Sequence, residues 1–377
     1  MIPVNEPLLG PQETANVLEC LQTGWISSAG RFIEEFERGW AAYCGRKYGI
    51  AVCNGTAALE VAIDSLQLEP GDEVIMPAST IISCALAVVY GQGVPVLVDS
   101  EPMTWCIDVN QIERKITPRT RAIMPVHIYG HPVDMDAVTN IAKSHGLAII
   151  EDAAEAHGAE YLTNRTSNHS TWQRCGSFGA LSCFSFYANK PITTGEGGMV
   201  LTDDETLAER ARSLRNLCFQ SGRRFFHEHL GHNFRITNLQ AAIGLAQIGK
   251  IDDIVSKKRW IGREYTSRLK DIDLLQLPTE ESWARSSYWM YGIVLDEKAR
   301  IDAAEFAQRL FANGVETRPF FLGMHEQPAF HKIKLFAGEH YPVAERIARR
   351  GLYLPSGLAL TEEQLTRVCE VVRKVLL

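Results

Sequence analysis

No hydrophobic run in this 377-residue chain approaches the roughly 18 residues that a membrane-spanning helix requires. The first ten residues, MIPVNEPLLG, lack both the basic stretch and the apolar segment of a secretory signal, so we expect none. Basic residues are not in excess either, since 38 Lys and Arg stand against 45 Asp and Glu, for a net charge of −7. Nucleic acids and anionic membranes both attract clustered Lys and Arg, so we expect neither as a main partner.

The nine cysteines include no C-x-x-C pair, which argues against a zinc ribbon or a dithiol redox motif. Most of them lie inside apolar runs and are expected to be small buried hydrophobic residues. Such cysteine usage is typical of a reducing compartment, so we expect a cytoplasmic protein. The chain also has no early G-x-G-x-x-G fingerprint, which disfavours a nicotinamide enzyme.

Apolar runs rich in Val and Ile alternate with segments of helical periodicity through the first two hundred residues. Near-continuous apolar runs are typical of strands buried on both faces, and the alternation predicts an α/β fold with a parallel or mixed sheet covered by helices. The predicted strands are 48–53, 73–76, 95–98, 122–127, 148–151, 181–187 and 199–202, and the predicted helices are 56–66, 81–90, 135–145 and 205–216.

A different pattern begins after Gln247. A charged amphipathic helix at 252–269, a strand at 288–295, a helix at 303–312, an extended segment at 315–321 and a terminal helix at 362–376 predict a smaller α+β unit. We therefore expect an N-terminal segment at 1–30, a large domain at 31–247 and a small C-terminal domain at 248–377. Trp283, Trp289 and Tyr291 are interpreted as core of the small domain, and the polar segment 163–175 as an irregular loop.

The motif NGTAAL at 54–59 follows one predicted strand and opens a predicted helix. Free amide N–H groups and the helix dipole at such a turn favour an anion such as phosphate, and Gly55 would let the anion approach the backbone closely. Asn and Thr are also common helix caps, so this turn alone is consistent with a purely structural role.

Two later segments place charged groups at the ends of predicted strands. At 149–155 an apolar strand runs into Glu151, Asp152 and Glu155, at the edge where open α/β sheets bind ligands. A half-buried carboxylate there needs a cationic partner, although a helix-capping Asp is an equal alternative. Lys190 stands between another apolar strand and a Gly-rich turn, where desolvation would suit an imine-forming amine. The alternative, a surface lysine in a hairpin turn, is disfavoured by these surroundings.

Together the three segments supply a phosphate cradle, a carboxylate and an amine. Pyridoxal 5′-phosphate requires all three, for its phosphate, its pyridinium nitrogen and its aldehyde. The sequence therefore predicts a pyridoxal-phosphate site.

Four motifs in order, NGTAAL, EDAAEAHGA, SFYANKPITTGEGGM and GHNFRITNLQAAIG, resemble the DegT/DnrJ/EryC1/StrS sugar aminotransferases. The resemblance extends from GWISSAGRFIEEFE to the C-terminal helix, and within the family it is closest to the GDP-perosamine synthases. It implies a pyridoxal-phosphate transferase of fold type I, with a mixed, mostly parallel sheet flanked by helices in the large domain and a smaller α+β C-terminal domain. It also explains the region around His227, His229 and His232 as a subunit-crossing loop, so we expect no metal site there.

The resemblance assigns roles to single residues. Lys190 would be the Schiff-base lysine and proton shuttle, and Asp152 would hold the pyridine nitrogen protonated. Lysine rather than histidine at position 190 favours transamination over 3-dehydration of the sugar. Asn233 would reach the phosphate in the neighbouring subunit, which implies a homodimer with shared active sites. The implied cofactor contacts are Gly55, Thr56, Ala57, Ile81, Asp152, Glu155, Ser185, Lys190 and Asn233, with Glu155 beside the 3-oxygen of the ring and Ile81 in place of the family's stacking aromatic residue.

The implied reaction moves the amino group of L-glutamate to C4 of a nucleotide-linked 4-keto-6-deoxy sugar. GDP-4-keto-6-deoxy-D-mannose is the leading acceptor, giving GDP-perosamine for surface polysaccharide synthesis. The alternatives are a UDP- or dTDP-linked keto sugar, or a non-catalytic pyridoxal-phosphate-binding regulator. The family's substrate contacts fall on Ser27, Ser28, Arg318 and His325, although a surface ion pair is an equal explanation for Arg318. Segment 163–175 is longer than the family's turn and is interpreted as a surface insertion, near the active-site mouth.

Overall fold

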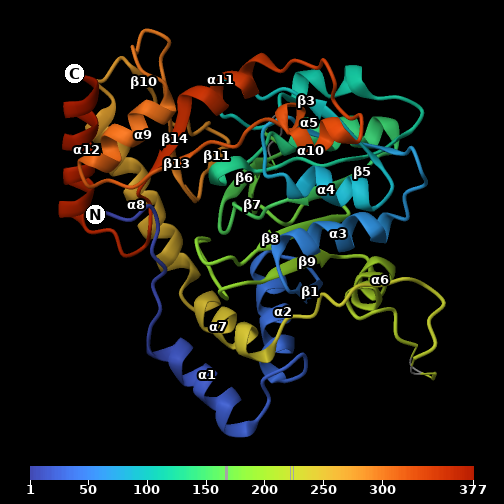
Figure 1. Ribbon diagram of the computed structural model, residues 1–377. Coiled ribbons are helices and arrows are strands. Elements are labelled where there is room, and N and C mark those ends of the chain that lie inside the picture. Colours follow the sequence, from blue (N-terminus) through green and yellow to red (C-terminus); the bar gives the residue numbers. More distant parts are fainter. Residues whose placement is uncertain (166–168, 221, 224) are drawn as a thin grey trace.

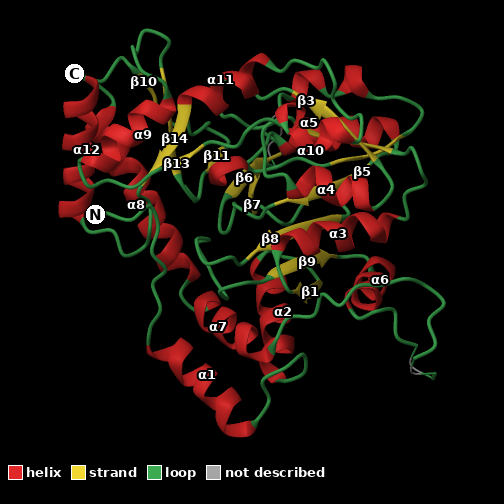
Figure 2. Ribbon diagram, viewed as in Figure 1, coloured by secondary structure: helices red, strands yellow, loops and turns green. Residues whose placement is uncertain are grey.

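The computed structural model describes residues 1–165, 169–220, 222–223 and 225–377 of the chain. Within these residues the strands form a seven-stranded, a four-stranded and a three-stranded sheet, with helices packed around them (Figures 1 and 2). The α-helices are α1 (Pro11–Thr23), α2 (Arg31–Tyr43), α3 (Gly55–Leu66), α4 (Ser83–Tyr90), α5 (Met135–His145), α6 (Glu205–Arg215), α7 (Asn238–Ile248), α8 (Ile251–Leu269), α9 (Ala303–Ala312), α10 (Pro328–Lys332), α11 (Pro342–Arg350) and α12 (Glu362–Leu376). Short 3₁₀ turns are η1 (Val109–Gln111), η2 (Glu113–Lys115), η3 (Ile128–Gly130) and η4 (Met324–Glu326).

The seven-stranded sheet is mixed and mostly parallel, as the sequence predicts. Its strands, in spatial order, are β1 (Tyr48–Val52), β9 (Gly198–Thr202), β8 (Leu181–Ser185), β5 (Ala148–Asp152), β4 (Thr120–Ile123), β2 (Glu73–Pro77) and β3 (Val94–Val98). Only β9 runs against its neighbours, pairing antiparallel with β1 and β8 in this described sheet. The predicted α/β class is therefore confirmed.

Helices cover both faces of the large sheet. Along β8, Leu181 and Cys183 belong to one hydrophobic cluster, which includes residues of α3, α4 and α5, whereas Phe184 belongs to another, formed with α2 and α7. Successive side chains of a strand point to opposite faces, so this division shows that β8 is buried on both sides. Double burial explains why the strand reads as a continuous apolar run.

Residues of the predicted site meet at one edge of this sheet. Asp152 ends β5, Ser185 ends β8, Asn54 follows β1 and Ile81 follows β2. All four strands run in the same direction, so their carboxyl ends form a common edge where α/β proteins bind ligands.

The four-stranded sheet lies in the C-terminal third of the chain. Its strands are antiparallel, in the order β10 (Leu275–Gln276), β12 (Tyr291–Leu295), β14 (Gly351–Leu354) and β13 (Arg318–Pro319). α8 extends from the end of α7 towards this sheet, where it lies against α12 (Figure 1). This arrangement fits the expected smaller α+β unit, while the domain boundaries at residues 30 and 247 stay a prediction.

The predicted loop at 163–175 is wrong in part, because Thr163 and Thr171–Arg174 belong to two paired strands. Strands β6 (Glu160–Thr163) and β7 (Thr171–Arg174) pair antiparallel, and β11 (Ala284–Arg285) adds a third strand to β6. Residues 166–168 of the segment lie outside the described residues. Among the described residues of this hairpin none lines the cavity discussed below, and a place near the active-site mouth stays a prediction.

Two predicted strands are shorter than expected for identifiable reasons. The predicted strand 122–127 ends at Ile123, since Pro125 has no N–H to donate to the sheet. The predicted strand 288–295 begins only at Tyr291, because Tyr288 has a left-handed backbone with φ of 48°. Trp289 is thereby left outside the regular strand.

No helix in the described part of the chain combines the length and the apolar composition that crossing a membrane requires.

Candidate active site

A cavity of about 490 Å³ opens at the carboxyl edge of the large sheet. It brings together the turn before α3, the start of α4, the end of β5 and the turn after β8, and residues near the small sheet close its far side. Its lining residues are Asn54, Gly55, Thr56, Leu59, Thr80, Ile81, Ser83, Val126, Asp152, Ala154, Glu155, Ser185, Tyr187, Asn189, Lys190, Glu196, Trp289, Phe321 and Tyr353.

The N-terminus of α3 points its first amides at this cavity. Asn54 caps the helix, with its side-chain Oδ1 accepting a hydrogen bond from the Ala57 N–H at 2.8 Å. Because Ala57 is engaged in the cap and is 2% exposed, the amides left at the cavity are those of Gly55 and Thr56. Unpaired N–H groups and the helix dipole make this end of α3 suitable for an anion.

Hydroxyl groups surround the same end of α3. Thr56 Oγ1 lies 2.7 Å from Ser83 Oγ, and Ser185 lines the cavity on the opposite side. A Cβ on Gly55 would come within 2.7 Å of Ser185 Cβ, so only glycine allows β8 and α3 to approach this closely. The arrangement gives an anion two backbone and up to three hydroxyl donors.

The Gly-rich turn after Lys190 packs closely against the rest of the chain. A Cβ on Gly198 would meet the backbone oxygen of Asn54 at 2.2 Å, and one on Gly197 would meet Thr194 Oγ1 at 2.2 Å. Gly198 therefore allows the chain to pass close to the backbone of the α3 turn, and Gly197 makes room for the Thr194 side chain.

Asp152 presents a carboxylate on the floor of the cavity and is 2% exposed. Its Oδ1 accepts from the Ala154 N–H at 3.0 Å, and its Oδ2 accepts from the Cys84 thiol at 3.1 Å. Burial raises the pKa of this carboxyl group, although both hydrogen bonds act in the opposite direction. Among the described residues no cation forms an ion pair with it, so a cationic ligand group would compensate its charge.

Lys190 projects its amine into the cavity from the turn after β8. The Nζ atom lies 3.8 Å from Glu155 Oε1 and 3.7 Å from the centroid of the Trp289 ring. Burial lowers the pKa of Lys190, although the negative charges of Glu155 and Asp152 act to raise it. Burial also raises the pKa of Glu155. A lysine amine moved toward its neutral form is a better nucleophile toward an aldehyde.

These residues fit pyridoxal 5′-phosphate. The amides and hydroxyls at α3 suit its phosphate, the unpaired carboxylate of Asp152 suits its protonated ring nitrogen, and Lys190 suits its aldehyde. Ile81, 39% exposed, forms part of the wall beside Asp152, where an aliphatic face can pack against a ring.

Six predicted site residues do not line the cavity of this chain. Ala57 is engaged in the helix cap, while Ser27, Ser28 and Asn233 are exposed. Arg318 is exposed and pairs with Glu316 at 2.7 Å. His325 is 4% exposed and its Nε2 lies 3.1 Å from Glu345 Oε1. Their roles in binding stay predictions.

Several cavity residues were missed by the sequence interpretation. Trp289 was interpreted as core of the small unit, yet it faces Lys190, and Phe321 and Tyr353 complete this aromatic wall. Tyr187 and Asn189 stand within three residues of Lys190, so their proximity to it was a usable signal. No local pattern distinguishes Trp289 from the many aromatic residues of the core.

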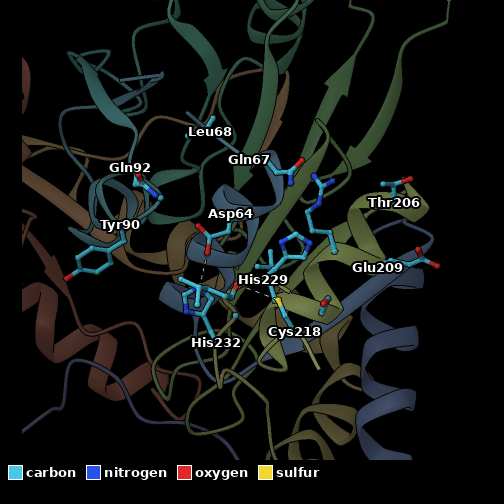
Figure 3. Close-up of a pocket in the computed structure, with 16 residues that line it drawn as sticks. Asp64, Gln67, Leu68, Tyr90, Gln92, Thr206, Glu209, Cys218, His229 and His232 are labelled. Carbon is cyan, nitrogen blue, oxygen red and sulfur yellow. Dashed lines mark hydrogen bonds and ion pairs between the residues drawn. The ribbon is translucent and has the colours of Figure 1, made fainter. Parts of the chain in front are cut away.

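A second cavity, of about 680 Å³, lies between the C-terminal ends of α3 and α4, helix α6 and the segment around residue 230 (Figure 3). His232 Nε2 lies 2.7 Å from Asp64 Oδ2, and the His232 ring stacks on Phe234. His227 instead contacts the backbone oxygen of Leu217 at 2.7 Å. These two histidines have different partners, so their spacing in sequence does not make them joint ligands.

A buried trio beneath Asp152 has the spacing of metal ligands. Within the described residues, His127, Glu151 and Cys175 place their ligand atoms within 4.8 Å of one another. His127 Nδ1 accepts from the Val133 N–H at 2.9 Å, so Nε2 carries the proton and donates to Glu151 Oε1 at 2.8 Å. The imidazole and the carboxylate thus bind each other, and Glu151 also accepts from the backbone N–H groups of Gly176 and Phe178.

Comparison with known proteins adds to this geometry. The model of the DegT/DnrJ/EryC1/StrS aminotransferase family matches residues 7–373. The chain is 42% identical over 376 residues to the GDP-perosamine synthase of Caulobacter vibrioides, covering 100% of this chain and 98% of the relative. It is 39% identical over 373 residues to the GDP-perosamine synthase of Escherichia coli O157:H7, covering 99% and 98%.

A solved structure extends the similarity to three dimensions. Streptomyces venezuelae DesV, in complex with a ketimine intermediate, superimposes with a TM-score of 0.87 at 35% identity, covering 96% of this chain and 93% of that chain. Every residue that lines the 490 Å³ cavity falls within the range 7–373.

Proposed function

The chain belongs to the DegT/DnrJ/EryC1/StrS aminotransferase family, and we propose that it transfers the amino group of L-glutamate to C4 of GDP-4-keto-6-deoxy-D-mannose, forming GDP-perosamine. The observation that carries this proposal is the convergence of the Lys190 amine, the Asp152 carboxylate and the α3 amides on one cavity. The full-length similarity to two GDP-perosamine synthases supports the choice of sugar and nucleotide.

Pyridoxal 5′-phosphate, when bound, supplies the carbonyl carbon that accepts the amino group and a ring that spreads the negative charge developed next to it. The residues around it have separable roles. Asp152 stabilises the positive ring nitrogen through a buried carboxylate, and Gly55, Thr56 and Ser185 anchor the phosphate. Lys190 binds the cofactor through Nζ and, when its amine is free, moves a proton at that atom.

The reaction is balanced without a further oxidant. L-Glutamate loses its amino group and leaves as 2-oxoglutarate, while the C4 ketone of the sugar becomes an amine. The two electrons lost by one substrate equal those gained by the other. A keto sugar linked to UDP or dTDP would balance equally, so the nucleotide rests on similarity and on the test below.

The active protein is a homodimer that shares its active sites. Asn233 is exposed and does not line the cavity of its own chain, which suits a residue that reaches the phosphate in a second copy. Nearby Phe225 and Leu230 are 76% and 95% exposed, and apolar side chains this exposed are suited to a partner surface.

The cofactor assignment is tested on the purified protein. Added pyridoxal 5′-phosphate should give a visible absorbance band, and borohydride reduction followed by peptide mass spectrometry should find the cofactor on Lys190. Lys190→Ala should lose the band, whereas Lys332→Ala, at an exposed position on α10, should keep it. A colourless wild-type protein, or reduction onto a different lysine, contradicts the assignment.

The substrate is tested with L-glutamate and GDP-, UDP- and dTDP-linked 4-keto-6-deoxy sugars, with a 3-keto isomer as control. We expect the highest turnover with GDP-4-keto-6-deoxy-D-mannose and an amine at C4 in the product, identified by NMR. Faster turnover of a UDP- or dTDP-linked sugar contradicts the nucleotide, and a deoxygenated product would indicate dehydration.

A further inference from the structure

The amine of Lys190 contacts both a carboxylate and an aromatic face. Glu155 Oε1 lies 3.8 Å from Nζ, and the centroid of the Trp289 ring lies 3.7 Å from Nζ. An ammonium group within about 6 Å of a tryptophan face is attracted by the negative charge of the ring. The contact is therefore close enough to stabilise the charged amine.

The Trp289 ring is held in a fixed orientation. Its Nε1 donates to the backbone oxygen of Asn189 at 2.8 Å, and the Asn5 amide donates to the same oxygen at 3.0 Å. The Tyr129 ring is nearly parallel to the Trp289 ring, at 13° and 6.2 Å between centroids. Because Asn189 directly precedes Lys190, the indole is attached to the same short turn that carries the amine.

Glu155 is held by the same neighbours. Its Oε2 accepts the backbone N–H of Tyr129 at 2.7 Å, and Tyr129 has a left-handed backbone with φ of 52°. Contacts thus run in a closed circuit from Lys190 to Trp289, to Tyr129, to Glu155 and back to Lys190. Neither the carboxylate nor the ring can move away from the amine without breaking a contact in that circuit.

We propose that Trp289 is a positioning residue for Lys190, and that its ring face together with the Glu155 carboxylate forms the site where the lysine ammonium rests whenever the amine is not bound to cofactor. This proposal rests on the proposed function. In a transamination the lysine is released while the amino group is carried elsewhere, so its nitrogen needs a defined place from which to deliver a proton. The circuit provides that place.

The charge on the amine reflects opposing influences. Burial lowers the pKa of Lys190, whereas the ring face and the two neighbouring carboxylates favour the charged form. The titratable groups that face the amine or line the cavity with it are Glu155 and Asp152, the Cys84 thiol, the His157 imidazole, Glu196, Tyr187 and Tyr353. Replacing the ring should therefore shift the titration of Lys190 while these groups stay in place.

The test measures the pKa of Lys190 in the full-length, cofactor-free protein, from the rate of its acetylation across pH by peptide mass spectrometry. Fluorinated tryptophans incorporated at position 289 withdraw electrons from the ring face without changing its shape. We expect the pKa of Lys190 to fall stepwise with the number of fluorine atoms, by up to about one unit. A pKa that does not respond to fluorination overturns the proposal.

Conventional variants provide the matched comparison. Trp289→Phe should retain part of the effect and Trp289→Leu should lose it. Phe321→Leu removes a ring of the same wall that stacks on Tyr129 and, among the described residues, makes no cation–π contact with Nζ, so it controls for added hydration. Equal pKa values for Lys190 in Trp289→Leu and Phe321→Leu would contradict a role for the ring. Acetylation needs no cofactor, so failure of the proposed function, seen as absent cofactor binding, is distinguishable from failure of this inference.

Discussion

The thiol of Cys84 donates a hydrogen bond to Oδ2 of Asp152 across 3.1 Å, and both side chains are almost closed to solvent. The thiol belongs to α4 and the carboxylate ends β5, so the bond joins two of the segments that build the cavity. Besides orienting the carboxylate, it stabilises the charged form that a protonated ring nitrogen requires.

Removing this donor should weaken cofactor binding. For Cys84→Ala we expect an affinity for pyridoxamine 5′-phosphate about fivefold lower, equivalent to one hydrogen bond of about 1 kcal/mol. The pKa of Asp152, already raised by burial, should rise further, so binding should be lost at a higher pH than in the wild type. Fluorescence titrations across pH measure both effects. Cys84→Ser keeps a donor and should bind more tightly than Cys84→Ala, and the reverse order contradicts the prediction.

The close packing of Gly55 against Ser185 gives a second prediction. Gly55→Ala places a Cβ 2.7 Å from Ser185 Cβ, so we expect a loss of about 1–3 kcal/mol in the free energy of unfolding and weaker phosphate binding. Gly249→Ala is the control, because its Cβ would lie 3.5 Å from the nearest atom, Ala246 O, at a φ of −60°. Urea unfolding measures the stability of both variants, and competition with inorganic phosphate measures their phosphate binding. Equal stability and equal phosphate binding in the two variants would contradict the prediction, since the structure would then accommodate the added Cβ at position 55 without cost.

Mixed dimers test the proposal that two subunits share each active site. Lys190→Ala and Asn233→Asp should each be nearly inactive alone, the latter because a new carboxylate faces the phosphate. If Asn233 acts across the interface, each hybrid dimer contains one intact site, so an equal mixture should regain about a quarter of wild-type activity.

The control for that experiment mixes Lys190→Ala with Asp152→Asn. Both residues line the cavity of a single chain, so their hybrids contain no intact site and should stay inactive. Absence of recovery in the Lys190→Ala and Asn233→Asp mixture, with dimers confirmed by light scattering, would show that Asn233 does not act in the neighbouring site.

A buried lysine outside the cavity predicts a dependence of stability on pH. Lys258, 1% exposed on α8, donates to the backbone oxygen of Ser356, and burial lowers its pKa to about 7 from 10.5. Between these values the unfolded chain binds more protons than the folded chain. Folding must therefore release a proton from Lys258, and this costs less free energy as pH rises. The free energy of unfolding should therefore gain up to about 1.4 kcal/mol per pH unit relative to Lys258→Met.

Urea unfolding from pH 7 to pH 9 measures this slope. Lys332→Met, which removes an exposed lysine, is the matched control and should keep the wild-type slope. Parallel curves for the wild type and Lys258→Met would show that Lys258 folds without giving up its proton.

The sequence predicted those site residues whose role can be recognised from the residues next to them in the chain. An apolar run that predicts a strand comes shortly before each of Lys190, Asp152 and Thr56. Parallel strands bring their carboxyl ends to one edge of the sheet. The position of these residues in one cavity was therefore predictable from local signals. Ser83 was less visible, since it starts a helix that carries no charged residue.

Other features depend on contacts between distant segments. The hairpin of β6 and β7 is polar and short, and its pairing with β11, more than a hundred residues away, has no local signal. Helix α1 is attached to α7 by Asn16, whose side-chain amide donates to the backbone oxygen of Ala242. The chain after α1 is attached to α7 by a second hydrogen bond, from the Asn238 N–H to the backbone oxygen of Ser27. Trp289 reaches Lys190 for the same reason, because tertiary packing overrides what its neighbours in sequence indicate.

The wall opposite Lys190 has a consequence for motion. Trp289 stands two residues before β12 of the small sheet, whereas Lys190 and Glu155 are carried by the large sheet. A hinge rotation that separated the two sheets would move the Trp289 ring away from Lys190 Nζ. The amine would then contact only the Glu155 carboxylate. The basicity of the Lys190 amine would therefore differ between a closed state, with the two sheets together, and an open state, with the sheets apart.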